Sequence, residues 1–257
     1  DGIDALKGGI YFWPRSFTLD NYAKFLSDDK WISAIFVSVG KTLIGTVSCV
    51  FFTCMVAYGM SFPNLALRKV YNLILLFCMY FSSGLIPYYL TLNQYGLLNT
   101  FWVYIIPSMF SIYYCILAKS FFSEMPFELY ESATLDGASD LTIYVRLILP
   151  LSKPLIATIA LFAAVEQWNT WTDTAFYCPG NKALRTLAYL MRDVIMKSQV
   201  DASAGKKALE MAAMHSTTTA QSIQMAAMVI AVLPIIMMYP FLQKYFVKGI
   251  MLGAVKG

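Results

Sequence analysis

Charged residues are scarce in this chain of 257 residues and are missing altogether from three long stretches. Asp, Glu, Lys and Arg make up 13% of the sequence, whereas soluble domains carry about 25%. None of the four occurs in 42–67, 70–118 or 211–243. Because a helix needs roughly 20 apolar residues to cross the hydrocarbon core of a bilayer, these stretches predict an all-α, polytopic membrane protein. The net charge of +4 is typical of loops beside lipid headgroups, and no nucleic-acid partner is expected.

The chain also lacks the motifs of common catalytic and metal sites. It has no G-x-x-x-x-G-K-[ST] sequence, so we expect no P-loop for ATP. It has no C-x-x-C pair and a single histidine, His215, so neither a zinc site nor a redox pair is expected. No nucleophile–base pair is recognisable. We therefore predict no catalytic residue, no bound metal and no cofactor.

The apolar stretches are bounded by turns and charges that predict five membrane spans. We expect these spans at about 32–61, 70–92, 101–122, 154–176 and 219–243. The polar connection at 177–218 is the longest and is expected on the outer side of the membrane. Lys41 falls within the first span, and we expect its long side chain to reach the interface.

A polar segment at 123–152 lies between the third and fourth predicted spans. Asp136-Gly137 within it is a turn signal, and Gly137 permits the positive φ that a tight turn needs. Ser139 is suited to cap a following helix. We therefore predict two short helices joined at an angle, here called the elbow. Leu129, Tyr130 and Ala133 are expected to face a groove on a partner protein.

The elbow resembles the cytoplasmic loop of the permease subunits of ATP-binding-cassette (ABC) importers. The family pattern is Glu-Ala-Ala, three residues, Gly, nine residues, then Ile-x-Leu-Pro. Here Glu131-Ser132-Ala133 and Gly137 keep the first spacing, and Ile148-Leu149-Pro150 follows after ten residues. Asp136-Gly137-Ala138 and Gln167-Trp168-Asn169 are similar to the sugar-importing, maltose-permease-like branch. The ending 246–257 resembles the subgroup that imports complex or acidic oligosaccharides.

The resemblance implies the type I importer permease fold in a multi-pass protein of the bacterial cell membrane, surrounded by lipid. That fold has six spans, so a further span is expected upstream of Asp1. The implied partners are a second permease subunit, two cytoplasmic ATPase subunits, an extracytoplasmic sugar-binding protein and an oligosaccharide substrate. The residues expected to couple to the ATPase are Glu131, Ala133, Asp136, Gly137, Ala138, Leu149 and Pro150.

The fourth predicted span combines ionisable, amide and indole side chains at Glu166, Gln167, Trp168 and Asn169. Ionisable groups at membrane depth are costly and point to a functional site. An indole face beside amide and carboxylate groups also suits sugars, so these four residues are expected to line a substrate path. An interfacial aromatic belt is the other interpretation of the same residues.

Other functional classes stay open at this point. The same machinery serves other solutes, such as peptides or phosphate. A secondary transporter driven by an ion gradient would need ionisable groups in several spans, and the second and third predicted spans have none. A structural membrane protein without transport is the remaining alternative.

Overall fold

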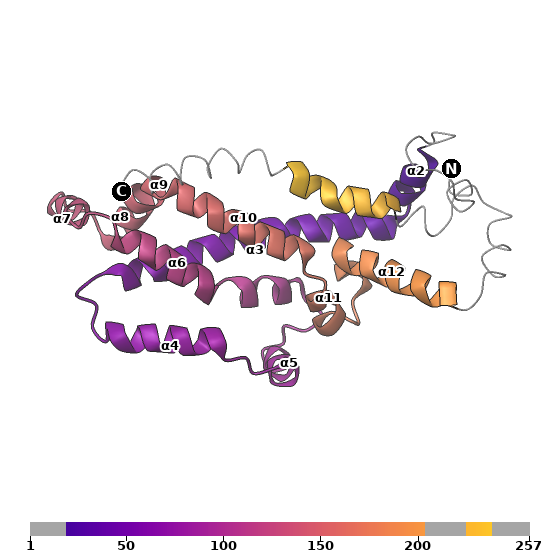
Figure 1. Ribbon diagram of the computed structural model, residues 1–257, viewed down its shortest axis with the longest axis horizontal. Helices are drawn as coiled ribbons and strands as arrows, with labels where there is room; N and C mark the ends of the chain where they lie inside the picture. The colour runs from indigo at the N-terminus through magenta and orange to yellow at the C-terminus, as the bar shows by residue number, and fades with distance from the viewer. Residues whose placement is uncertain (1–18, 204–224, 238–257) are drawn as a thin grey trace. The chain divides into compact units, whose positions relative to one another are not determined.

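The computed structural model describes residues 19–203 and 225–237, and these residues form helices without any β-strand (Figure 1). The all-α prediction is therefore confirmed. The helices before the elbow are α2 (Asp20–Ser27), α3 (Asp29–Ser61), α4 (Arg68–Tyr80), α5 (Leu85–Gln94), η1 (Phe101–Tyr104), η2 (Ile106–Ser108) and α6 (Ile112–Ser123). Those that follow are α7 (Glu128–Leu135), α8 (Asp140–Ile143), the π-helix η3 (Tyr144–Ile148), α9 (Leu149–Leu151), α10 (Lys153–Asn169), α11 (Thr172–Tyr177), η4 (Lys182–Leu184), α12 (Leu187–Ser203) and a helix at Met225–Met237.

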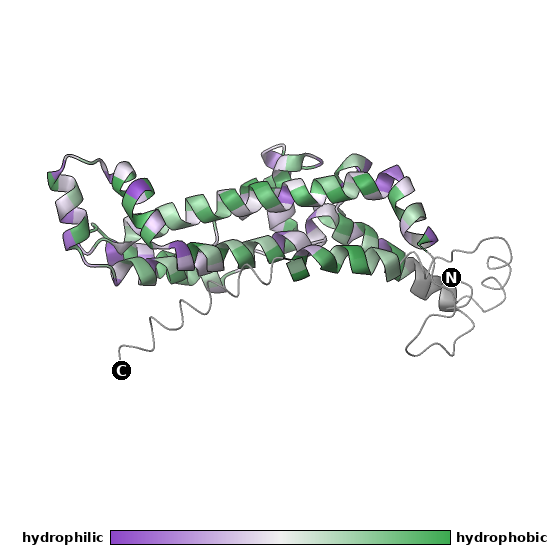
Figure 2. Cartoon of the chain, turned by 90° about the horizontal axis from the view of Figure 1, so that it is seen from above, coloured by the Kyte–Doolittle hydropathy of each residue, from purple (hydrophilic) through white to green (hydrophobic). Residues whose placement is uncertain are grey.

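Among the described residues, α3 is the helix that is long and apolar enough to cross a membrane by itself. Its 33 residues would extend about 50 Å at 1.5 Å per residue. The number of spans rises to four if each of three bent helix pairs forms one span. Most of the ribbon is hydrophobic, as Figure 2 shows. The side chains of Leu43 and Val47 on α3 are 62% and 69% exposed, which suits contact with lipid or with another membrane subunit.

The second predicted span, 70–92, is not one helix in the structure. Helix α4 ends at Tyr80, α5 begins at Leu85, and the two are bent by 114°. Gly84, just before α5, has φ +82°, which a glycine adopts without steric cost. Pro87 lies in the first turn of α5, where its missing N–H leaves no intrahelical bond unmade.

The third predicted span, 101–122, is also divided. It consists of the short 3₁₀ helices η1 and η2 followed by α6. Pro107 lies within η2, and a proline cannot continue an α-helix through its own position without losing a hydrogen bond. Regular α-helix therefore begins only at Ile112, after Ser111 caps α6 by accepting a bond from the Tyr114 N–H.

The remaining predicted segments agree with the structure only in part. The fourth predicted span, 154–176, is divided between α10 and α11. The connection at 177–218 contains η4 and the 17-residue helix α12, which we had not predicted. The last predicted span, 219–243, is described only at 225–237, and 246–257 lies outside the described residues.

The chain divides into two compact units, each with its own core. The first unit comprises Asp1–Gly40 and Trp168–Met238, and the second comprises Lys41–Gln167 and Tyr239–Gly257. In the first unit, Phe25 and Trp31 pack with ring centres 4.6 Å apart, against Leu187 and Leu190. The core of the second unit is built mainly from residues of α3, α6, α8, η3 and α10.

A close approach between α3 and α10 gives the second unit a testable packing constraint. A Cβ atom added at Gly45 would lie 2.7 Å from the Gln167 Nε2 atom, which is too close for the side chain to stay in place. No atom lies within 4 Å of a Cβ added at Gly59 on the same helix.

We expect Gly45→Ala to be less stable than Gly59→Ala. Alanine gains about 1 kcal/mol over glycine in a helix interior, so Gly59→Ala is expected to stabilise the protein. Gly45→Ala is expected to lose about 1–3 kcal/mol relative to Gly59→Ala because it overpacks the contact with Gln167. Thermal unfolding of the two purified variants in detergent measures the difference, and equal midpoints would contradict the close approach.

Candidate functional site

The first helix of the elbow ends in a Schellman motif centred on Gly137. The Ala138 N–H donates to the Ala133 carbonyl and the Gly137 N–H donates to the Thr134 carbonyl, both at 3.0 Å. Gly137 has φ +81°, as the turn prediction required. These two bonds satisfy carbonyl groups that the end of α7 would otherwise leave unpaired. Ala133 and Ala138 are the positions where the motif brings the chain close to itself, so small residues suit both.

The second helix of the elbow is capped and tied back to the first. Ser139 Oγ accepts a hydrogen bond from the Thr142 N–H, as predicted. The Tyr130 hydroxyl on α7 donates to Asp140 Oδ1 on α8 at 2.9 Å, and this bond raises the pKa of Tyr130 because it stabilises the protonated phenol. The two helices are therefore held in one arrangement by bonds on both sides of the turn.

The faces of the elbow differ in part from the prediction. Tyr130, Ala133, Ala138 and Leu149 are partly buried and pack against the core of the second unit, so one side of Tyr130 and of Ala133 is directed inward. On this side of α7, the Tyr130 ring meets the ring of Phe62, the residue after α3, at 4.8 Å.

The outward face of the elbow carries other side chains. Leu135 and Leu141 are 88% and 59% exposed, and Leu129, which was predicted to face outward, is 37% exposed. Glu131, Asp136, Gly137 and Pro150 are exposed beside them.

Glu166 and Gln167, next to each other near the end of α10, have different surroundings in the second unit. Gln167 is buried, and its Nε2 atom donates to the Tyr104 carbonyl and to Ser108 Oγ. Glu166 is exposed, and its carboxylate accepts a hydrogen bond of 3.3 Å from the Tyr114 hydroxyl. Gln167 therefore fixes η1 and η2 to α10, whereas the Glu166 carboxylate stays accessible.

Lys41 lies in the same unit and does not reach an interface. Its side chain is completely buried, with Nζ 4.9 Å from the centre of the Tyr104 ring. The expectation that Lys41 reaches the interface is therefore wrong. The ring face of Tyr104 provides a cation–π contact inside the protein, which hydropathy alone does not reveal.

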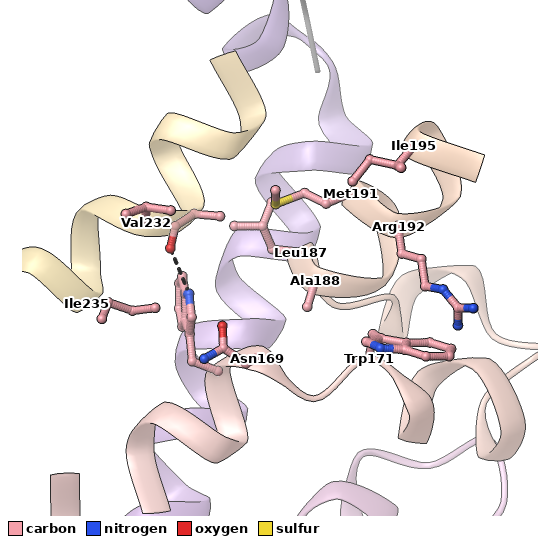
Figure 3. Close-up of a pocket in the computed structure, with 11 residues that line it drawn as sticks. Asn169, Trp171, Leu187, Ala188, Met191, Arg192, Ile195, Val232 and Ile235 are labelled. Carbon is pink, nitrogen blue, oxygen red and sulfur yellow. Dashed lines mark hydrogen bonds between the residues drawn. The ribbon is translucent and has the colours of Figure 1, made fainter. Parts of the chain in front are cut away.

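Trp168 and Asn169 belong to the first unit and line a pocket of about 320 Å³ (Figure 3). Its walls come from the end of α10, from α12 and from the helix at Met225–Met237, and most of its lining is apolar. The Trp168 Nε1 atom donates to the Ala231 carbonyl at 2.9 Å. The Arg192 guanidinium lies 3.2 Å from the centre of the Trp171 ring, a stacked cation–π arrangement. The pocket thus offers indole groups, an amide and a positive charge.

Arg192 was missed because we interpreted its segment as a polar connection. The sequence did carry a signal, since Leu187, Leu190, Met191 and Val194 recur at the spacing of an amphipathic helix. Charged residues between them obscured this periodicity.

The comparison with known proteins identifies the family. A family model described as the inner membrane component of binding-protein-dependent transport systems matches residues 32–252. This chain belongs to that family. It is a membrane permease subunit of such a transport system, and the resemblance drawn from the elbow is confirmed.

Individual relatives agree with this assignment. Protein LplC of Bacillus subtilis (strain 168) is 38% identical over 248 residues, which covers 96% of this chain and 82% of LplC. The polygalacturonan/rhamnogalacturonan transport system permease protein YtcP of the same organism is 39% identical over 247 residues, with coverages of 95% and 84%.

A solved structure gives the fold. The crystal structure of a bacterial ABC transporter involved in the import of the acidic polysaccharide alginate matches with a TM-score of 0.84 and 26% identity. The match covers 95% of this chain and 85% of that one. The fold is therefore that of a type I ABC importer permease, as predicted.

The Schellman motif predicts how the elbow responds to substitution at Gly137. No atom lies within 4 Å of a Cβ added there, so the effect of a larger side chain is backbone strain alone. Gly137→Val is expected to cost about 1–2 kcal/mol because a β-branched residue resists positive φ. Gly137→Asn, which tolerates that conformation, is the matched control. Hydrogen exchange of the 137 and 138 amides measures the loss, and equal protection in both variants would contradict it.

Proposed function

We propose that this permease subunit belongs to an ATP-driven importer of oligosaccharides, acidic ones included. The observation that carries the proposal is the elbow. It is a pair of short helices whose outward face exposes Leu135 and Leu141 among polar side chains. A helix with an exposed apolar face in a polar setting is suited to lie in a groove of a partner protein.

The partner at the elbow is inferred to be a cytoplasmic ATPase. The sequence has no P-loop, so ATP must be hydrolysed by another subunit and the work must reach the membrane through a contact. Glu131, Asp136 and the exposed leucines of the elbow supply that contact. A second permease subunit, a second ATPase subunit and an extracytoplasmic sugar-binding protein complete the proposed importer. On this arrangement the connection at 177–218 lies on the outer side of the membrane.

The proposed substrate rests on two kinds of support. YtcP is named for polygalacturonan and rhamnogalacturonan, and the structural relative is named for alginate. Within this chain, the pocket of the first unit combines Trp168, Asn169 and the Arg192–Trp171 pair. Apolar ring faces and directional amide groups suit sugar rings, and a guanidinium forms charge-assisted hydrogen bonds to a carboxylate. In the second unit, Glu166 offers an accessible carboxylate to sugar hydroxyls.

Uptake by the reconstituted importer tests the proposed function. The chain would be co-expressed with its gene neighbours, purified and placed in proteoliposomes with labelled oligogalacturonate outside. We expect accumulation only when ATP is present at the side of the ATPase, and ionophores that collapse ion gradients should leave it unchanged. Accumulation driven by an ion gradient without ATP would overturn the proposal. If no oligosaccharide is taken up but another solute is taken up in an ATP-dependent way, the choice of substrate is overturned.

Variants of the candidate path separate acidic from neutral sugars. Arg192→Gln is expected to reduce uptake of oligogalacturonate about tenfold, since a charge-assisted hydrogen bond is lost, and to leave a neutral oligosaccharide unaffected. Arg192→Lys keeps the charge and is the matched control. Trp168→Ala and Glu166→Leu are expected to impair uptake of both sugars while expression stays intact. Normal transport in Arg192→Gln, Trp168→Ala and Glu166→Leu would remove these residues from the path and support the aromatic-belt interpretation.

A further inference from the structure

A continuous series of aromatic rings connects the elbow to the interior of α3. It begins with Phe127 and Tyr130 at the start of the elbow and passes through Phe62, the residue after α3. It continues through Tyr58 on α3 and Tyr144 on η3, and ends at Phe51 on α3. We call these six residues the aromatic column. All of them belong to the second unit.

Each neighbouring pair in the aromatic column is in ring contact. Phe127 stacks on Tyr130 with ring centres 5.4 Å apart, and Tyr130 meets Phe62 edge-on at 4.8 Å. Phe62 meets Tyr58 at 5.0 Å. These separations lie within the range at which aromatic pairs attract each other, so the elbow is joined to the last turn of α3 without a gap.

The second half of the column holds α3 over two helical turns. Tyr144 stacks on Tyr58 at 5.4 Å with the ring planes 24° apart, and it contacts the Phe51 ring at 6.3 Å. The Tyr144 hydroxyl also donates to the Phe51 carbonyl at 3.1 Å. Phe51 and Tyr58 are seven residues apart, which is about two turns of an α-helix. The Tyr144 side chain therefore contacts α3 at two positions that lie two turns apart.

The middle of the aromatic column is buried, so its rings have little room to move independently of their neighbours. Tyr58 and Tyr144 are 8% and 1% exposed and lie in the core of the second unit, beside Phe122. Close-packed interiors have low compressibility and transmit displacement. Tyr144 is also the first residue of the π-helix η3, a rare geometry that is frequent at functional sites.

We propose that the aromatic column transmits movement of the elbow to α3, with Tyr58 and Tyr144 as its positioning residues. When the elbow is displaced, Tyr130 moves Phe62 and the end of α3, and Tyr144 moves the same helix two turns further along its length. The helix then shifts as one rigid piece with the elbow. The inference rests on the proposed function, because it takes the elbow as the point at which the ATPase acts.

The test uses the complete importer in proteoliposomes and measures sugar molecules transported per ATP hydrolysed. Tyr58→Leu and Tyr144→Leu are expected to lower this ratio about tenfold, within the range found for residues that carry coupling. Basal ATP hydrolysis and co-purification of the ATPase are expected to stay at the level of the unaltered importer.

Two controls separate the column from general packing. Tyr58→Phe keeps the ring, and the Tyr58 hydroxyl has no hydrogen-bond partner within the described residues, so the transport ratio is expected to stay within about twofold. Phe121→Leu removes a ring that packs against the same core but lies outside the column, and it too is expected to leave the ratio unchanged. A loss in Phe121→Leu equal to that in Tyr58→Leu would overturn the proposal.

Phe62→Leu provides a second route if the variants of the buried tyrosines do not fold. Phe62 is only partly buried, so its loss disturbs the core less. If the rings carry the movement, Phe62→Leu lowers the ratio by itself, whereas Phe121→Leu leaves it unchanged. Unchanged coupling in Phe62→Leu and in every tyrosine variant that folds would overturn the column. That result would leave the elbow intact as a docking site, whereas absence of an ATPase from the purified unaltered importer would overturn the proposed function itself.

Discussion

Backbone N–H and C=O groups of a segment within a bilayer must find partners inside the protein, because the hydrocarbon core offers no water. Unbroken helices meet this requirement by themselves, as α3 does. Each break in a helix leaves groups that need a side chain instead. Where η1 and η2 interrupt the third predicted span, Gln167 and Ser108 both donate to the Tyr104 carbonyl. Thr53 Oγ1 accepts a hydrogen bond from the Ser111 N–H at the end of the same interruption.

The same requirement explains which polar residues are available for function. Gln167 and Ser108 are occupied in holding broken helices together, so their polarity serves the fold. The Glu166 carboxylate, which is exposed, and the Arg192–Trp171 pair, which lines a pocket, are the groups proposed to meet a substrate. The distinction depends on what each side chain contacts and cannot be drawn from residue type, since Glu166 and Gln167 are neighbours in the sequence.

The elbow shows how a short local motif can serve a larger assembly. Its Schellman motif and the hydrogen bond from Tyr130 to Asp140 restrict its conformation. A conformationally restricted element transmits a displacement that a flexible loop would not. Its inward face carries Tyr130 and Tyr144 into the packed core, while its outward face leaves Leu135 and Leu141 exposed. One segment thereby connects a proposed ATPase surface to a membrane helix.

The sequence by itself determined the features that depend on local chemistry. The absence of charge over long stretches defined a helical membrane protein, and Asp136-Gly137 with Ser139 defined the turn and the cap of the elbow. The conformational freedom of glycine and the capping ability of serine act within a few residues, so no tertiary information was needed. The spacing from Glu131 to Pro150 then indicated the family.

Only the tertiary structure decided which face of the elbow points inward and which polar groups are buried. Lys41 is enclosed because the ring of Tyr104, far along the sequence, covers it. Tyr144 grips α3 because the fold brings η3 beside Phe51 and Tyr58. The free energy of burying a polar or aromatic group depends on the partners that surround it. Those partners come from distant segments, and a pattern read along one chain does not contain their positions.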